Sequence, residues 1–239
     1  MNRIALMVSR NLTKVPGAWF KLCRYAKSAA SHPEQEQERY DHIRYISTLA
    51  VTTGNINLQI TGLENLPEQD GFLIYANHQG LFDCVALVYA CPRPLAAVCK
   101  KELKGIPFVQ QVIDCTKSFL MDRDDARQSL SVIQEVTKEV ASGRNYVIFP
   151  EGTRSRDGNK IQEFHGGSFR AAIKAKKPVV PVAVVDTHKV FDTRGSEPVS
   201  AQLHFLPAIE SSEFEGMKAQ ELADLVKARI EEAVSNSIS

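Results

Sequence analysis

The sequence predicts an α/β fold, a single layered αβα domain around a mostly parallel or mixed sheet, preceded by N-terminal amphipathic helices. From residue 54 onward, short apolar runs alternate with stretches of helical periodicity, which is typical of a layered sheet protein. The chain has 239 residues and 44% of them are hydrophobic, enough for one substantial core. We therefore divide it into a helical segment for membrane association, residues 1–53, and an α/β domain, residues 54–239.

The N-terminal segment has an apolar face and a basic face. On a helical projection of residues 4–15, the apolar face consists of Ile4, Ala5, Val8, Leu12 and Val15. Pro16-Gly17 is expected to break this helix, and a second short helix with Trp19 and Leu22 on its apolar side is expected to follow. No acid precedes Glu34. The cations before it are Arg3, Arg10, Lys14, Lys21, Arg24 and Lys27.

Two interpretations fit these helices. They could pack on the domain as a hairpin with solvated lysines, or they could lie on a membrane. Trp19 and Phe20 beside the cations favour the membrane, because aromatic rings prefer the headgroup level and each nearby cation adds about 1 kcal/mol on an anionic surface. We expect residues 1–30 to bind a membrane surface without crossing it.

Strand and helix signals follow in alternation. Ser31-His32-Pro33-Glu34 resembles a capping box and predicts a third helix that runs to about Thr52, with Gly54-Asn55 ending it. Residues 56–61 and 72–76 then predict two strands, the second of them buried.

The remainder of the chain repeats this pattern. Strands are expected at short apolar runs, and helices where apolar residues recur every three or four positions. The expected strands are 95–99, 119–121, 146–149, 179–185 and 201–206. The expected helices are 81–91, 101–113 with a break at Pro107, 124–142 closed by Gly143, 164–176, and a covering helix at 216–234.

Composition limits the partners and the location. The net charge is +1 and the pI is about 7.7, so no excess of positive charge points to nucleic acid. Five cysteines without paired spacing, in a chain with no secretory signal, predict reduced thiols. No run reaches the ~18 apolar residues that a membrane span needs. We expect a cytoplasmic protein, peripheral on the inner face of the cell membrane.

A histidine and a carboxylate follow the strand expected at residues 72–76, in Asn77-His78-Gln79-Gly80-Leu81-Phe82-Asp83. This position puts His78 at the carboxyl end of the sheet, where α/β proteins place their sites. Asp83 falls in the first turn of the next helix, within reach of the imidazole. A carboxylate on one ring nitrogen leaves the other free to accept a proton. On its own, His78 would more readily be read as a capping or core residue, and the other histidines show no spacing that completes a metal site.

The second motif is Phe149-Pro150-Glu151-Gly152-Thr153-Arg154-Ser155, which follows the strand expected at residues 146–149. Gly152 permits a tight turn in which backbone N–H groups can face a ligand. Arg154 and Arg156 offer forked donors to a phosphate. A surface turn with a solvated Glu-Arg pair is the alternative interpretation of these residues.

Together the two motifs resemble those of the 1-acylglycerol-3-phosphate O-acyltransferases, the lysophosphatidic acid acyltransferases of glycerophospholipid synthesis. The resemblance covers about residues 58–185. Lys100-Lys101-Glu102-Leu103 is similar to the family's Lys-Glu-Leu segment, and Phe119-Leu120-Met121-Asp122-Arg123 to its phosphate-binding arginine block. Pro178-Val179-Val180-Pro181-Val182-Ala183 is similar to its Val-Pro-Val strand.

This resemblance implies an enzyme that moves a fatty acyl group from an acyl thioester, acyl-CoA or acyl carrier protein (acyl-ACP), to the sn-2 hydroxyl of 1-acylglycerol 3-phosphate, giving phosphatidate. It implies His78 as general base and Asp83 as its orienting partner, with no covalent acyl-enzyme and neither metal nor cofactor. The implied substrate-binding residues are Glu151, Gly152, Thr153, Arg154, Arg123 and Lys101.

Three alternatives stay open. The acceptor could be another glycerolipid, such as glycerol 3-phosphate, another lysophospholipid or a lyso-amino lipid. A His/Asp thioesterase would use water in place of the alcohol. A non-catalytic lipid-binding protein would keep only the fold and the basic membrane face.

Overall fold

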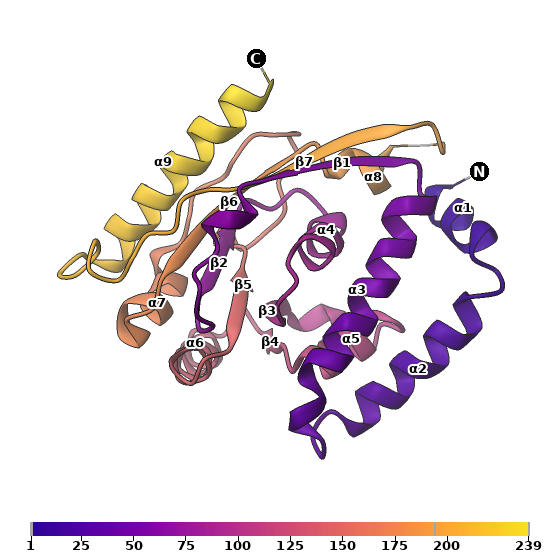
Figure 1. Ribbon diagram of the computed structural model, residues 1–239. Coiled ribbons are helices and arrows are strands. Elements are labelled where there is room, and N and C mark those ends of the chain that lie inside the picture. The colour runs from indigo at the N-terminus through magenta and orange to yellow at the C-terminus, as the bar shows by residue number, and fades with distance from the viewer. Residues whose placement is uncertain (1, 194, 239) are drawn as a thin grey trace.

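The computed structural model, which describes residues 2–193 and 195–238, is built around one seven-stranded sheet in the order β1-β7-β6-β2-β5-β3-β4 (Figure 1). Neighbouring strands are parallel except β6 and β7, which are antiparallel. The strands are β1 (Ile56–Thr61), β2 (Leu73–Ala76), β3 (Leu95–Lys100), β4 (Phe119–Met121), β5 (Asn145–Ile148), β6 (Val179–Val185) and β7 (Val199–Phe205).

Helices cover both faces of the sheet, as the layered α/β prediction requires (Figure 1). One face carries α6 (Ala126–Ala141), α7 (Arg170–Ala175) and α9 (Ala219–Ile238). The other face carries α3 (Glu36–Thr53), α4 (Phe82–Ala90), α5 (Val109–Thr116) and α8 (His188–Asp192), with α1 (Arg3–Arg10) and α2 (Val15–Ser28) outside them. Four short 3₁₀ helices complete the described elements: η1 (Pro33–Gln35), η2 (Leu63–Asn65), η3 (Lys101–Leu103) and η4 (Gly166–Phe169).

Two hydrophobic cores lie against the two faces of the central strands. Along β2, Leu73 and Tyr75 pack with the α6, α7 and α9 side, whereas Ile74 and Ala76 pack with the α4 side. Successive strand side chains point to opposite faces, so a strand covered on both sides must be apolar throughout. Every residue of β2, β5 and β6 is buried. These strands form a rigid support for the loops that follow them.

The local signals predicted most elements, and two of them were wrong in detail. Pro16-Gly17 does not separate the first two helices, because the break falls at residues 11–14 and Pro16 lies in the first turn of α2, where its fixed φ suits a helix. The expected cap at Ser31 does not form either. The Ser31 hydroxyl donates to the carbonyl of Ser28 (3.1 Å), and α3 begins at Glu36 after a 3₁₀ turn.

The N-terminal helices contact the domain on one face and expose an apolar face to solvent. Ile4, Val8, Leu12 and Val15 are between 37% and 66% exposed, and Phe20 is 72% exposed. The opposite side of these helices is buried through Leu6, Met7, Leu22 and Tyr25. No helix among the described residues is both long and apolar enough to cross a membrane.

Arg3, expected among the surface cations, is buried instead. Its guanidinium donates to the carbonyls of Val190 (2.8 Å), Gly54 (2.7 Å) and Glu197 (2.8 Å). These carbonyls lie in α8, before β1 and before β7. Since β7 runs antiparallel to β6, all three are near the carboxyl end of β6. Arg3 therefore holds α1 at that edge of the sheet.

Candidate active site

The loops that carry the two motifs leave the sheet at the same edge. Strands β6, β2, β5, β3 and β4 are neighbours and run in one direction, so their carboxyl ends lie side by side. The residues that follow these ends are Thr187 after β6, His78 after β2, Glu151 after β5, Lys101 after β3 and Arg123 after β4. Open parallel sheets bind ligands at this edge.

His78 and Asp83 are in direct contact, as their spacing predicts. Nδ1 of His78 lies 2.7 Å from Oδ2 of Asp83, and the same oxygen accepts the backbone N–H groups of Gln79 (2.7 Å) and Gly80 (3.0 Å). The Asp83 side chain is fully buried, while that of His78 is 22% exposed. An Nδ1–H donated to a carboxylate leaves Nε2 as the proton-accepting nitrogen. The imidazole also stacks on the Phe149 ring, 4.2 Å between centroids.

Glu151 ties the second motif to the first. Its side chain is buried, Oε1 accepts the backbone N–H of His78 (2.7 Å), and Oε2 accepts the N–H of Gln162 (3.0 Å). Burial raises the pKa of this carboxyl group because a charged form is disfavoured away from water. The N–H of Ser155 in turn donates to the carbonyl of His78 (2.8 Å). Both Glu151 oxygens therefore hold backbone groups of the site.

Gly152 turns the chain directly after Glu151. Its φ is +73°, in the left-handed region that favours glycine, and a Cβ there would lie 3.4 Å from the His165 ring. Thr153 and Arg154 follow on the exposed side of the loop. Nη1 of Arg154 is 3.7 Å from Oδ1 of Asp192 in α8. The arginine is thus on the β6 side of His78.

Lys101 and Arg123 lie on the other side of His78. Adjacent strands are about 4.8 Å apart, so the ends of β3 and β4 are roughly 10 and 14 Å from that of β2. Nζ of Lys101 is 2.6 Å from Oδ2 of Asp122, and the Lys101 side chain is 46% exposed. Arg123 is exposed. Two loops joined by hydrogen bonds hold the motif residues His78, Asp83, Glu151 and Gly152. The cations of Arg154, on one side, and of Lys101 and Arg123, on the other, flank these loops.

Three polar residues of this edge were absent from the sequence prediction. Gln79 is buried, and its Oε1 accepts the backbone N–H of Thr187 (2.9 Å) while its Nε2 donates to Asn159 Oδ1 (2.7 Å). The hydroxyl of Thr187 donates to Oδ1 of Asp83. Thr187 and Asn159 stand outside both motifs, and only the order of the strands brings them to Asp83 and Gln79.

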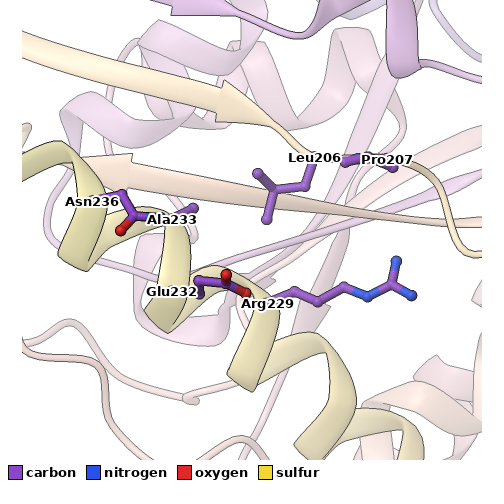
Figure 2. Close-up of a pocket in the computed structure, with 6 residues that line it drawn as sticks. All are labelled: Leu206, Pro207, Arg229, Glu232, Ala233 and Asn236. Carbon is purple, nitrogen blue, oxygen red and sulfur yellow. The ribbon is translucent and has the colours of Figure 1, made fainter.

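Other features of the surface are separate from this site. A hollow of about 320 Å³ lies between the end of β7 and α9 (Figure 2). Its lining residues are Leu206, Pro207, Arg229, Glu232, Ala233 and Asn236, none of which belongs to a motif. Within residues 2–193 and 195–238, no group of three His, Cys, Asp or Glu side chains has an arrangement that could hold a metal ion.

Comparison with known proteins finds acyltransferases, both among family models and among individual relatives. The family model described as Acyltransferase matches residues 57–185. The 1-acyl-sn-glycerol-3-phosphate acyltransferase of Salmonella typhimurium is 34% identical over 70% of this chain and 69% of its own length. That of Borreliella burgdorferi is 26% identical over 76% of this chain and 73% of its own length.

A solved structure supports the same fold. The crystal structure of the 1-acyl-sn-glycerophosphate acyltransferase from Thermotoga maritima superposes with a TM-score of 0.74, over 92% of this chain and 96% of that one, at 22% identity. The predicted α/β architecture and the predicted family are both confirmed. This chain is an acyltransferase and belongs to the 1-acyl-sn-glycerol-3-phosphate acyltransferase family.

Proposed function

We propose that this enzyme transfers a fatty acyl group from an acyl thioester to the sn-2 hydroxyl of 1-acylglycerol 3-phosphate and so makes phosphatidate. The observation that carries the proposal is the 2.7 Å contact between His78 and a fully buried Asp83. It supplies a base with a fixed tautomer beside a partly open surface. The identity of the acceptor is inferred from the relatives, which are named 1-acyl-sn-glycerol-3-phosphate acyltransferases.

In this mechanism His78 acts first as general base. Nε2 takes the proton of the sn-2 hydroxyl as the oxygen attacks the thioester carbonyl, and Asp83 stabilises the imidazolium that forms. The resulting tetrahedral intermediate collapses with loss of the thiolate, which takes the proton back from His78. The thioester is already activated, so the base is the main catalytic requirement.

Direct transfer, without an acyl-enzyme, is supported by the state of the nearby cysteines. Burial raises the pKa of Cys99 to about 11 and raises that of Cys84, the residue after Asp83. A thiol is nucleophilic only as the thiolate, which these pKa shifts disfavour at neutral pH. The chain also has no Gly-x-Ser-x-Gly sequence, the context of a serine nucleophile.

The phosphate of the acceptor binds between the flanking cations. Arg123 is the principal donor, because the residue is exposed and a guanidinium suits bidentate contact with phosphate. Lys101 contributes less, since Asp122 already holds its ammonium group. The loop after β5 faces the acceptor lipid with Gly152, Thr153 and Arg154. Glu151 acts by fixing the His78 backbone, because both of its oxygens are occupied by N–H groups.

The substrates reach the site from a membrane surface. Residues 1–30 present the exposed apolar side chains Ile4, Val8 and Leu12, and Arg3 holds α1 at the edge of the sheet that carries the motif loops. This arrangement supports attachment to a membrane surface, and we propose that the protein is peripheral on the inner face of the cell membrane. The acceptor and the diacyl product are both lipids and are most concentrated there.

The test is to supply labelled lysophosphatidate with palmitoyl-CoA or palmitoyl-ACP in turn and to look for labelled phosphatidate. Release of the thiol only when the acceptor is present supports the proposal. Equal thiol release without acceptor indicates a thioesterase. Glycerol 3-phosphate and lysophosphatidylethanolamine are tested in parallel. If either is acylated faster than lysophosphatidate, that compound is the acceptor.

A further inference from the structure

Asp83 makes more hydrogen bonds than its partnership with His78 requires. Oδ2 accepts from Nδ1 of His78 and from the backbone N–H groups of Gln79 and Gly80. Oδ1 accepts from the hydroxyl of Thr187. Among the described residues, Thr187 is the hydrogen-bond donor to Oδ1, so it holds the oxygen that the histidine motif does not.

Thr187 reaches Asp83 because of the strand order. It lies 104 positions beyond Asp83 in the sequence, just after β6, and β6 is the parallel neighbour of β2. Its backbone N–H donates to Gln79 Oε1 (2.9 Å), which fixes the residue against the His78 loop. The residue is fully buried. It therefore does not line the solvent-exposed surface where substrate binds.

The hydroxyl of Thr187 is not used to cap its own helix. Thr187 is the N-cap residue of α8, and a threonine there usually accepts a hydrogen bond from the first turn. Here the side chain makes no such bond. Its oxygen instead lies near two acceptors, Asp83 Oδ1 and Gln79 Oε1 (3.1 Å). The hydroxyl has one proton to donate, and the charged Asp83 carboxylate is the stronger acceptor.

We propose that Thr187 is a positioning residue for catalysis, which orients the Asp83 carboxylate so that Asp83 holds the His78 imidazole. This inference rests on the proposed role of His78 as general base. With both oxygens bound, the carboxylate plane cannot rotate about the Cβ–Cγ bond. Without the hydroxyl, Oδ1 becomes an unsatisfied acceptor in a site closed to water, and the carboxylate turns toward other donors. The contact between Oδ2 and Nδ1 then weakens.

The decisive variant is Thr187→Val, which removes the hydroxyl and nearly keeps the shape. We expect kcat to fall roughly tenfold to a hundredfold, the equivalent of one hydrogen bond to a charged group. The KM for lysophosphatidate and for palmitoyl-CoA should stay within about twofold, because a buried residue that does not contact substrate leaves uniform binding intact. Thr187→Ser keeps the hydroxyl and should recover most of the kcat.

Thr116→Val is the matched control. Thr116 is also buried, and its hydroxyl bonds to the carbonyl of Val112 (2.9 Å) and to Ser118 (2.7 Å), at the opposite end of the sheet from the motif loops. A similar loss of kcat in this variant would mean that the effect is one of general stability. We expect its kcat to match that of the wild type.

Two further results, at Thr187 itself, would overturn the inference: a Thr187→Val enzyme with more than about half of the wild-type kcat, or a Thr187→Ser enzyme as impaired as the valine variant. If Thr187→Val does not fold, Thr187→Ala is measured against the same criteria. His78→Ala is assayed alongside. Full activity in His78→Ala refutes the proposed role of His78 as general base, on which this inference rests, whereas activity lost there but kept in Thr187→Val refutes only the role of Thr187.

Discussion

The edge of the sheet that carries the site has two halves of different construction. Around β6, β2 and β5 the side chains of Gln79, Asp83, Glu151 and Thr187 are buried, and the two carboxylates are held by backbone and side-chain donors. Around β3 and β4 the polar side chains are exposed, and Lys101 is in a surface ion pair. Buried charges are costly unless they are fully bonded, whereas surface ion pairs contribute about 0–1 kcal/mol. The half around β6, β2 and β5 therefore holds its side chains in a fixed geometry. In the half around β3 and β4, a side chain can exchange its present ion pair for a contact with substrate.

The largest effect is expected from His78→Ala in the buried half. Loss of the base should lower kcat by about 10² to 10⁴-fold. The melting temperature should change little, because Asp83 keeps the donors Gln79, Gly80 and Thr187. Steady-state kinetics and thermal unfolding check both parts. His32→Ala, at an exposed histidine paired with Glu34, is the control, and near wild-type turnover of His78→Ala would exclude the mechanism.

In the exposed half we expect losses of affinity. Arg123→Ala should raise the KM for lysophosphatidate roughly tenfold to a hundredfold, the effect of one charge-assisted hydrogen bond, with kcat little changed. Lys101→Ala should have a smaller effect, because Asp122 already neutralises the ammonium group. A fall in kcat with unchanged KM in Arg123→Ala would contradict the assignment of substrate affinity to the exposed half and catalysis to the buried half.

A smaller effect is expected from the N-terminal face. Phe20→Glu, at a side chain that is 72% exposed, should reduce co-sedimentation with anionic vesicles by roughly tenfold or more, the equivalent of one buried aromatic side chain. Leu130→Glu changes a 42% exposed leucine on α6 and should leave vesicle binding unchanged. Substitution is preferable to truncation, because Arg3 and Leu22 are part of the packed structure. Equal binding by both variants would argue against a membrane role for this face.

The smallest effect concerns the pH dependence of stability at Glu151. Burial raises its pKa above the usual 4.5 of a glutamate, so the folded state binds the proton more tightly than the unfolded state. The free energy of unfolding should therefore decrease as pH rises from about 4.5 through the raised pKa. Glu151→Gln lacks this titration. Urea unfolding across this range should show the difference between the two proteins shifting in favour of the glutamine variant as pH rises.

Local patterns predicted what depends on local physics. The sequence pattern located all seven strands. β2, β5 and β6 are apolar because both of their faces are covered, whereas β1 alternates apolar and polar residues because one of its faces is exposed. The contact of His78 with Asp83 spans five positions across one strand-to-helix turn, so its spacing alone carried the information. The contact between the two motifs was not predicted, and it arises because β2 and β5 are parallel neighbours that end at one edge of the sheet.

The errors at Pro16-Gly17 and Ser31 were local, whereas what the sequence did not show at Arg3, Thr187 and Glu151 depends on contacts between distant parts of the chain. A helical projection assigned Arg3 to a basic surface, yet the carbonyls that bury it are 51 to 194 positions away. Thr187 stands outside both motifs, and the role proposed for it follows from β6 lying beside β2. That Glu151 lines the acceptor site stays a prediction, but the sequence did not show that its oxygens bind the backbone N–H groups of His78 and Gln162. No single window of sequence contains these partners.

The burial of Arg3 also has a consequence for the order of folding. Its partner Glu197 is 194 positions away, so α1 cannot reach its final place until most of the chain has been synthesised. Contacts of such long range form late, after the loops between them have closed. We expect the first helix to be the last to dock, so that the apolar N-terminal face is assembled only on a finished catalytic domain. Pulsed hydrogen exchange during refolding would detect this as late protection of the α1 amides.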